Sequence, residues 1–431
     1  MMATEAKLAR DRVLAHARPG AVRARLYQGW EMAAVGFLSV AIVFGITATT
    51  LPFVYSAVMA EFGWSLTEAT LLFTYKNFAS AAAALFLLGP VLQRFGLRWL
   101  MVGSFVSTGL GFAAFLIVDS LPSYYLAGIV LGFGGAAATI GTNVFVSRWF
   151  YRNQGFAVGL TLTGISVGGM VFPVLTVALI ESIGWRGAMA GLSSLIWLVA
   201  LPIYLWRAKE EPTMSDLGAE AYGTYTARDR ACVVTRTAPA DTGRSLGPLW
   251  RTPAFWTIAA ALFIAAAADA AIFQHTPMLL AAAGIDSKTI AFCLSTMFAF
   301  GIVGKIAAGR LYDAWSVNGM AVWNVLLAVS IALALLVAET AALVVFTAVR
   351  GLAHGGLIPK PAVLATHCYG TVLMSTVMPV LMGVWLLGAG VGPVVLAILV
   401  DATGRYHEGA LVLVAVSLVA AVLLSRTRGR A

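Results

Sequence analysis

The chain has 431 residues, of which 60% are hydrophobic and only 11% are charged, and its mean hydropathy is +0.88. This composition excludes a water-soluble protein, because no soluble core of this size buries so much apolar surface. The net charge of +9 is accounted for by basic residues beside apolar stretches. We therefore expect a lipid bilayer as partner and no binding of nucleic acid.

The first 27 residues form a basic segment without an apolar stretch. A cleavable signal peptide needs an apolar core of about 7–15 residues, so this segment is predicted to be a cytoplasmic tail. Its basic residues are Lys7, Arg10, Arg12, Arg18, Arg23 and Arg25.

Twelve apolar stretches follow, each of about the 20 residues that are needed to cross a hydrocarbon layer of about 30 Å. The sequence therefore predicts an all-α integral membrane protein. The predicted helices cover residues 30–57, 69–92, 98–118, 122–147, 154–180, 185–206, 253–283, 287–309, 317–338, 342–366, 371–399 and 407–424.

A long polar run, residues 207–252, separates the sixth predicted helix from the seventh. It indicates a cytoplasmic linker between two six-helix halves. The predicted organisation is a tail (1–27), an N-terminal half (28–206), the linker (207–252), a C-terminal half (253–424) and a second tail (425–431).

The loops between the predicted helices carry an uneven distribution of basic residues. If both termini are cytoplasmic, only Arg186, Lys288 and Arg405 fall in loops on the opposite side, as the positive-inside rule requires. Compact loops and the lack of a targeting segment favour a bacterial inner membrane, and we expect a monomer.

Glycine spacings repeat between the two predicted halves. Gly89 and Gln93 correspond to Gly309 and Asp313, and Gly134 and Gly135 correspond to Gly355 and Gly356. The set Gly159, Gly164 and Gly168 returns as Gly383, Gly388 and Gly392. Two parallel repeats predict a pseudo-twofold axis along the membrane normal, with a substrate site near the midplane. Glycines four apart serve either plain helix packing or sliding of one half on the other.

Two stretches carry a family resemblance. Gly89-Pro-Val-Leu-Gln93-Arg94-Phe-Gly96-Leu-Arg98 resembles the loop motif of the major facilitator superfamily, with Gln93 where the family usually has Asp or Asn. The stretch 148–164 resembles the entry to helix five in the branch of monocarboxylate transporters and oxalate/formate antiporters. The resemblance implies the major facilitator fold, with twelve helices in two pseudo-symmetric halves.

The loop motif and its counterpart in the second half are interpreted as a conformational gate. Arg94 and Arg98 would bond helix ends or carboxylates and hold one conformation closed. The alternative is that topology alone places these basic residues there. The predicted gating residues are Gly89, Gln93, Arg94, Gly96, Arg98, Gly309 and Asp313.

Ionisable residues at membrane depth are costly and indicate function. Lys305 lies in the eighth helix, two turns before Asp313 at the cytoplasmic end and so close to mid-membrane; the resemblance implies a basic residue at this position that meets a substrate carboxylate. A lysine neutralises a carboxylate as a point charge. The alternative is a structural ion pair.

Further candidate substrate-binding residues lie in the second, fourth and tenth helices. Lys76, with Tyr75 and Asn77 beside it, either faces the cavity or reaches the outer interface. Asn143 either lines the cavity or bonds across helices, and Arg350 is either a cavity residue or a partner for Glu339.

Candidate proton-coupling residues lie in the seventh helix. Asp269 either carries the coupled proton or neutralises Lys305. For His275, an imidazole that titrates near neutral pH would suit a proton relay, although a lone histidine on an apolar face is more often a hydrogen-bonded core residue. His354 is the second imidazole at this depth.

The leading hypothesis is a secondary active transporter for a small organic anion, by proton symport or anion exchange. Efflux of a lipophilic drug or cation is the alternative, but it would favour an acidic cavity. A transporter-like sensor is the third class. No nucleophile, metal cluster or nucleotide motif indicates an enzyme, a metal or a cofactor.

Overall fold

The computed structural model describes residues 28–150, 154–210, 252–337 and 340–426, and within these ranges it is helical without a strand. The all-α prediction is confirmed. The N-terminal helices are α2 (Gln28–Thr49), α3 (Leu51–Phe62), α4 (Leu66–Ala82), α5 (Leu88–Ala114), α6 (Leu121–Trp149), α7 (Gln154–Leu195) and α8 (Leu201–Arg207). The C-terminal helices are α11 (Pro253–Ala282), α12 (Ser287–Leu333), α13 (Thr340–Leu357), α14 (Lys360–Thr403) and α15 (Tyr406–Arg426).

Ten helical runs in the described ranges are long and apolar enough to cross a membrane. Two of them, Leu66–Ile117 and Phe156–Arg207, have 52 residues each, or about 78 Å at 1.5 Å per residue. Each run breaks at a glycine with positive φ, Gly96 at 81° and Gly184 at 74°, a backbone conformation that favours glycine. Each long run therefore holds two of the predicted helices, and the ten runs are compatible with twelve crossings.

The tenth helix ends earlier than predicted. α13 stops at Leu357 and α14 begins at Lys360, whereas the sequence predicted one helix over 342–366. Pro361 explains the break, because a proline ring collides with the carbonyl four residues before it, here that of Leu357.

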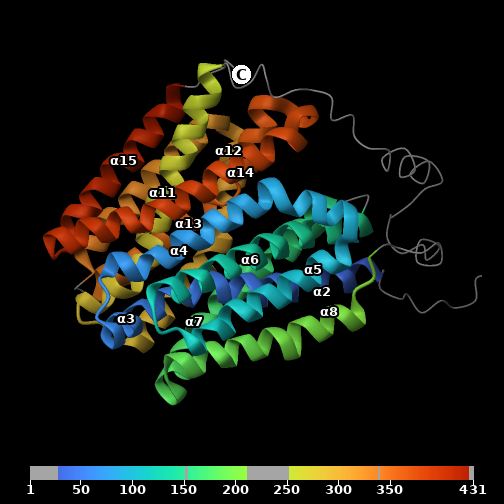
Figure 1. The fold of residues 1–431 in the computed structure, drawn as a ribbon. Coiled ribbons are helices and arrows are strands. Elements are labelled where there is room, and N and C mark those ends of the chain that lie inside the picture. The colour runs from blue at the N-terminus through green and yellow to red at the C-terminus, as the bar shows by residue number, and fades with distance from the viewer. Residues whose placement is uncertain (1–27, 151–153, 211–251, 338–339, 427–431) are drawn as a thin grey trace, which may run out of the picture.

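The two groups of helices lie side by side, the N-terminal one coloured blue to green and the C-terminal one yellow to red (Figure 1). Each has its own buried apolar cluster. Arg207, at the end of α8, binds Glu31, at the start of α2, at 3.0 Å. We call this end of the bundle the near end and the opposite one the far end.

Close helix packing in the N-terminal half depends on glycine. Gly164 and Gly168 of α7 lie against backbone carbonyls of α2, and a Cβ at Gly168 would come within 2.1 Å of the Ala41 oxygen. Gly159, in the same helix, has no atom within 4 Å of a Cβ built there.

The C-terminal half repeats this packing between α14 and α11. A Cβ at Gly388 would lie 2.3 Å from the Phe263 oxygen, and one at Gly392 would lie 1.9 Å from the Ala267 oxygen. These four close contacts all lie inside a half. They serve helix packing, whereas sliding surfaces between the halves would have to lie across their interface.

Polar contacts join the two halves at the far end. The Asp401 carboxylate of α14 accepts from the Thr67 amide at 2.9 Å and from its hydroxyl at 2.5 Å. The Lys288 ammonium lies 3.4 Å from the Glu181 carboxylate. Deeper in the bundle, the Thr74 hydroxyl of α4 donates to the Gly390 carbonyl of α14 at 2.6 Å.

Candidate functional site

Lys305 lies at the contact between the halves. It is 18 residues after Ser287, the first residue of α12, or about 27 Å along the helix axis. Its ammonium donates a hydrogen bond to the Ser166 hydroxyl of α7 at 2.7 Å, and the side chain is half-buried. Among the described residues it has no carboxylate partner. A half-buried cation without a counter-ion is a suitable group to meet an anion.

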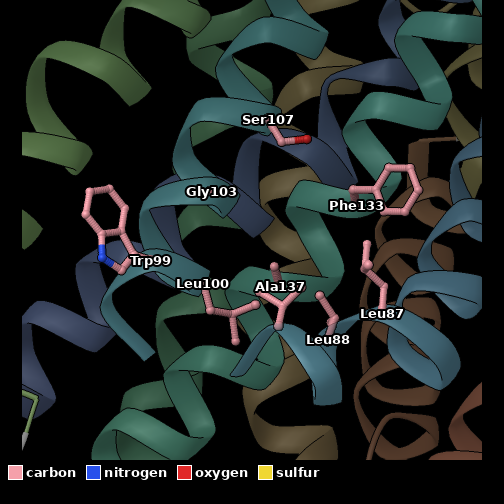
Figure 2. A pocket seen from close by; sticks show the side chains of 9 residues that line it. Leu87, Leu88, Trp99, Leu100, Gly103, Ser107, Phe133 and Ala137 are labelled. Atoms are coloured by element: carbon pink, nitrogen blue, oxygen red, sulfur yellow. The ribbon is translucent and has the colours of Figure 1, made fainter. Parts of the chain in front are cut away.

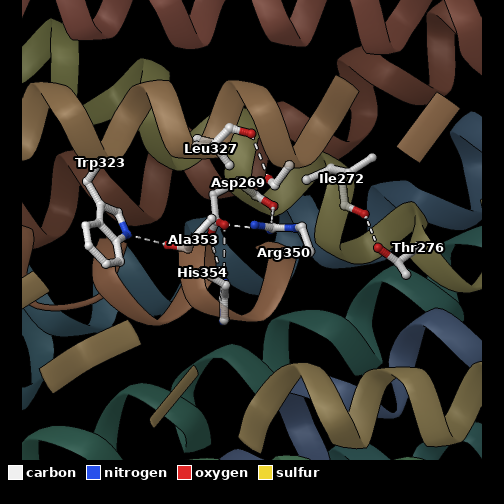
Figure 3. A network of polar contacts seen from close by, with 9 residues as sticks. Asp269, Ile272, Thr276, Trp323, Leu327, Arg350, Ala353 and His354 are labelled. Carbon is white, nitrogen blue, oxygen red and sulfur yellow. Dashed lines mark hydrogen bonds and ion pairs between the residues drawn. The ribbon is translucent and has the colours of Figure 1, made fainter. Parts of the chain in front are cut away.

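Asp269 does not neutralise Lys305, so that alternative is wrong. Its carboxylate binds Arg350 Nη2 at 2.6 Å and His354 Nδ1 at 2.9 Å (Figure 3). Arg350 Nη2 also donates to the Asp269 carbonyl at 2.9 Å. The Arg350 side chain is 0% exposed and that of Asp269 is 5% exposed. The opposite charges stabilise each other in this buried setting, although Nε and Nη1 of Arg350 have no hydrogen-bond partner among the described residues.

Glycines in α13 position this buried cluster. Gly351 and Gly355 lie against carbonyls of α12, where added Cβ atoms would come within 2.4 Å and 2.1 Å of backbone oxygens. Arg350 and His354 each precede one of these glycines and are one helical turn apart, so they share a different face of α13. That face meets Asp269 of α11.

Arg350 was predicted to face the cavity or to pair with Glu339. It is buried and pairs with Asp269 instead; Glu339 lies outside the described residues. The sequence analysis also missed His354 as a partner of Asp269. The available signal was the four-residue spacing of Arg350 and His354, which places a cation and an imidazole on one helical face.

The second-helix candidates have contacts with aromatic rings and with their own helix. The Lys76 ammonium lies over the Phe73 ring, 4.5 Å from its centroid, and the side chain is half-buried. Tyr75 packs on Tyr125 with ring centroids 4.8 Å apart. Asn77 is buried and donates to the Phe73 carbonyl of its own helix at 2.8 Å.

Asn143 keeps an unused acceptor. Its side-chain oxygen is buried and has no hydrogen-bond partner among the described residues. A buried acceptor without a donor is unfavourable, so this oxygen is suited to a donor from a ligand or from water. The structure shows no contact between Asn143 and Lys305 or Lys76.

His275 lies in the interior of the C-terminal half. It is fully buried, and its Nε2 lies 2.9 Å from the Pro393 carbonyl while its Nδ1 lies 3.3 Å from the Tyr406 hydroxyl. Both ring nitrogens are therefore engaged, linking α11 to α14 and α15. This arrangement matches the hydrogen-bonded core histidine considered as an alternative to a relay.

The loop motif lies at the near end. Gln93 and Arg94 are exposed, and the Arg94 guanidinium lies over the adjacent Phe95 ring at 5.5 Å. Arg98 donates to the Leu205 carbonyl of its own half at 3.3 Å. A Cβ at Gly89 or Gly309 would meet nothing within 4 Å, and the Asp313 side chain lies outside the described residues. The gate therefore remains a prediction.

An apolar pocket of about 160 Å³ lies in the N-terminal half (Figure 2). It holds no ionisable side chain and lies on other helices than Lys305 and Asp269, so we do not assign the substrate to it. It is lined by Leu87, Leu88, Val91, Trp99, Leu100, Gly103, Ser107, Phe133 and Ala137.

Solved structures share this fold. A bacterial homologue of the human lysosomal transporter Spinster, in an inward-facing and unoccupied conformation, matches with a TM-score of 0.68 over 95% of this chain and 96% of that chain. The sequence identity is 17%, so the match shows the fold alone.

Curated relatives are transporters. Monocarboxylate transporter 13 of Bos taurus is 27% identical over 88% of this chain and 84% of its own length. The Fujikurins efflux protein of Gibberella fujikuroi is 26% identical over 52% of this chain and 45% of its own length. The family model of the Major Facilitator Superfamily matches residues 36–341. The chain therefore belongs to the Major Facilitator Superfamily and is a solute transporter, not an enzyme.

Proposed function

We propose that this transporter carries a small organic anion, in the simplest case a monocarboxylate, by secondary active transport. The observation that carries the proposal is Lys305, a half-buried cation at the contact between the halves without a carboxylate partner among the described residues. Its only hydrogen bond there goes to Ser166, a neutral group that a substrate carboxylate can outcompete. The monocarboxylate transporters among the relatives support the same substrate class.

The transport cycle that we propose is alternating access between the two halves. The hydrogen bonds and ion pairs that join described residues of the two halves lie from the Lys305 level to the far end. This distribution supports a conformation closed at the far end. Opening of the far end would require the Asp401 and Lys288 contacts to separate.

The placement in the cell is likewise a proposal. We infer that the near end faces the cytoplasm of a bacterial cell, with residues 207–252 as the linker between the halves. Arg94, Arg98, Arg148 and Arg207 lie at the near end, in the excess that the positive-inside rule associates with the cytoplasm. A monomer suffices for this mechanism, with the proton or a second anion as co-substrate.

A thermal-shift screen of purified protein against monocarboxylates, dicarboxylates, amines and lipophilic cations tests the substrate class. A ligand at 100 times its Kd stabilises the folded state by about 2.7 kcal/mol. We expect stabilisation by a carboxylate in the wild type, its loss in Lys305→Ala and its partial retention in Lys305→Arg. Arg310→Ala, in the same helix but at an exposed position near its other end, is the matched control and should respond like the wild type.

Two results would overturn the proposal. An undiminished response of Lys305→Ala to the carboxylate would make the lysine structural. Stabilisation of the wild type by lipophilic cations alone would replace anion transport with efflux of a cation.

A further inference from the structure

The apolar pocket of the N-terminal half opens on the surface of the bundle. It lies between the two helical arms that meet at the Gly96 turn of α5, and α6 forms its back wall (Figure 2). Leu87 and Trp99, on its rim, are 44% and 66% exposed. A Cβ built at Gly103 would meet no atom within 4 Å, so this glycine keeps the pocket open.

The walls of the pocket suit an apolar chain. Ser107, whose side chain carries the one lining hydroxyl, donates its hydrogen bond to the Val130 carbonyl at 2.7 Å and so has no free donor to offer. A cavity of about 150 Å³ with apolar walls stays dry and takes up benzene. The volume of about 160 Å³ therefore has room for a short stretch of an acyl chain.

The pocket has the depth of one leaflet of a bilayer. Leu87 precedes Gly96 by nine residues and Ser107 follows it by eleven. At 1.5 Å per residue, the pocket reaches about 14–16 Å from the turn, which is half of a hydrocarbon core of about 30 Å. A lipid whose headgroup lies at the near end can therefore place an acyl chain in the pocket.

Basic groups surround the mouth of the pocket. Arg94 and Arg98 lie two residues on either side of Gly96, both are exposed, and neither has a carboxylate partner among the described residues. Glu210 brings one carboxylate to this turn, 3.9 Å from a Cβ built at Gly96. Trp99 follows Arg98, and tryptophan is typical of the headgroup level. Two guanidinium groups against one carboxylate favour an anionic headgroup.

We propose that the pocket is a binding site for an anionic phospholipid of the near-end leaflet. One acyl chain lies between the two arms, and Arg94 and Arg98 bind the phosphate, which a guanidinium can hold with two parallel hydrogen bonds. The chain gains no hydrophobic free energy when it leaves the bilayer, because lipid tails are as apolar as leucine. The shape of the pocket therefore admits the chain, and the arginines select the headgroup. The site is independent of the solute that the transporter carries.

Photo-crosslinking tests where the lipid binds. The probe is phosphatidylglycerol with a diazirine in the middle of one acyl chain, in phosphatidylcholine vesicles that contain the full chain. We expect the adducts of the wild type to concentrate in residues 87–107 and 133–137. Gly103→Leu fills the pocket and should lose most of these adducts. Gly159→Leu, at another exposed glycine with free space around it, is the matched control and should keep them.

A phosphatidylcholine probe with the same chain tests the headgroup. The wild type should be labelled more by phosphatidylglycerol, because each basic residue at the membrane surface raises the affinity for anionic lipid about fivefold. The double variant Arg94→Gln/Arg98→Gln should lower the labelling ratio of the two probes by about 25-fold. Arg310→Gln, at an exposed position of the other half, should leave the ratio unchanged.

Three results would overturn the proposal. Adducts spread evenly over all lipid-facing helices, or undiminished adducts in a folded Gly103→Leu variant, would show that the pocket holds no bound chain. Equal labelling of the wild type by the two probes would show that the site does not select an anionic lipid. If Gly103→Leu does not fold, the adduct map of the wild type and the comparison of the two probes decide.

Discussion

Gly168→Ala should destabilise the protein, although alanine is the better helix former. A Cβ at Gly168 would lie 2.1 Å from the Ala41 carbonyl oxygen of α2, whereas carbon and oxygen in contact are about 3.3 Å apart. The two helix backbones would have to separate by roughly 1.2 Å at this point. Overpacking of this kind costs about 1–3 kcal/mol.

Gly159→Ala is the matched control in the same helix. Both changes bring the same gain in helix propensity, about 1 kcal/mol, but a Cβ at Gly159 meets no atom within 4 Å. The difference between the two variants therefore isolates the overpacking, and it should favour Gly159→Ala by about 1–3 kcal/mol.

Thermal unfolding in detergent, followed by tryptophan fluorescence, measures this difference. Each half has the size of a domain for which 1 kcal/mol corresponds to about 2–4 °C, so Gly168→Ala should unfold at least a few degrees below Gly159→Ala. Equal unfolding temperatures, or a more stable Gly168→Ala, would show that α2 and α7 are not as close as the structure places them.

Three further predictions concern buried and terminal polar groups. Asn324→Leu leaves the buried Lys360 ammonium without its acceptor and should lower the free energy of unfolding by about 1–3 kcal/mol. In thermal unfolding, the double variant with Lys360→Met should recover most of this stability. Additive losses of stability in the double variant would contradict the argument. Asp401→Ala removes both hydrogen bonds between its carboxylate and Thr67 at the far end and should make the contact between the halves there easier to open. A cysteine introduced at position 74 should then react faster with an impermeant maleimide added from that side. An unchanged reaction rate would count against a closed far end. Asp286→Ala removes the N-terminal cap of α12 and should lower the unfolding temperature. The hydroxyl and the amide of Thr289 donate hydrogen bonds to the Asp286 carboxylate and lower its pKa. The cap therefore stabilises the protein above the ordinary aspartate pKa, and this stabilisation is lost only as the pH falls through the lowered pKa. If the difference in unfolding temperature between wild type and variant disappeared near neutral pH, the argument would be wrong.

The fold was predictable because the membrane imposes simple rules on the sequence. Long apolar stretches must form helices in a hydrocarbon layer, since their backbone groups have no other partners. Two breaks were equally visible, because Gly96 and Gly184 lie between predicted helices and glycine can turn a helix. The helix ends were less predictable, as the early stop of α13 at Leu357 shows.

The partners of the buried charges were not predictable. Several basic residues at membrane depth were possible partners for Asp269. The sequence could not show which of them lies on a helix that packs against α11. The choice of Arg350 follows from the rotation of α13, which Gly351 and Gly355 fix by packing on α12. A small change in that rotation would turn Arg350 away from Asp269, so the pairing depends on packing and cannot be inferred from charge alone.

The two halves share the same glycine packing, but they differ in the number of charged side chains at membrane depth. Gly168 against Ala41 and Gly392 against Ala267 are equivalent contacts with nearly equal distances, so both halves retain the same helix arrangement. Among the described acidic, basic and imidazole side chains at membrane depth, Lys76 alone belongs to the N-terminal half, whereas Asp269, His275, Lys305, Arg350, His354 and Lys360 belong to the other. A charged substrate that binds between the halves would therefore gain most of its electrostatic stabilisation from the C-terminal half. The N-terminal half would contribute mainly neutral contacts such as Ser166, which break and re-form at little cost as the halves move.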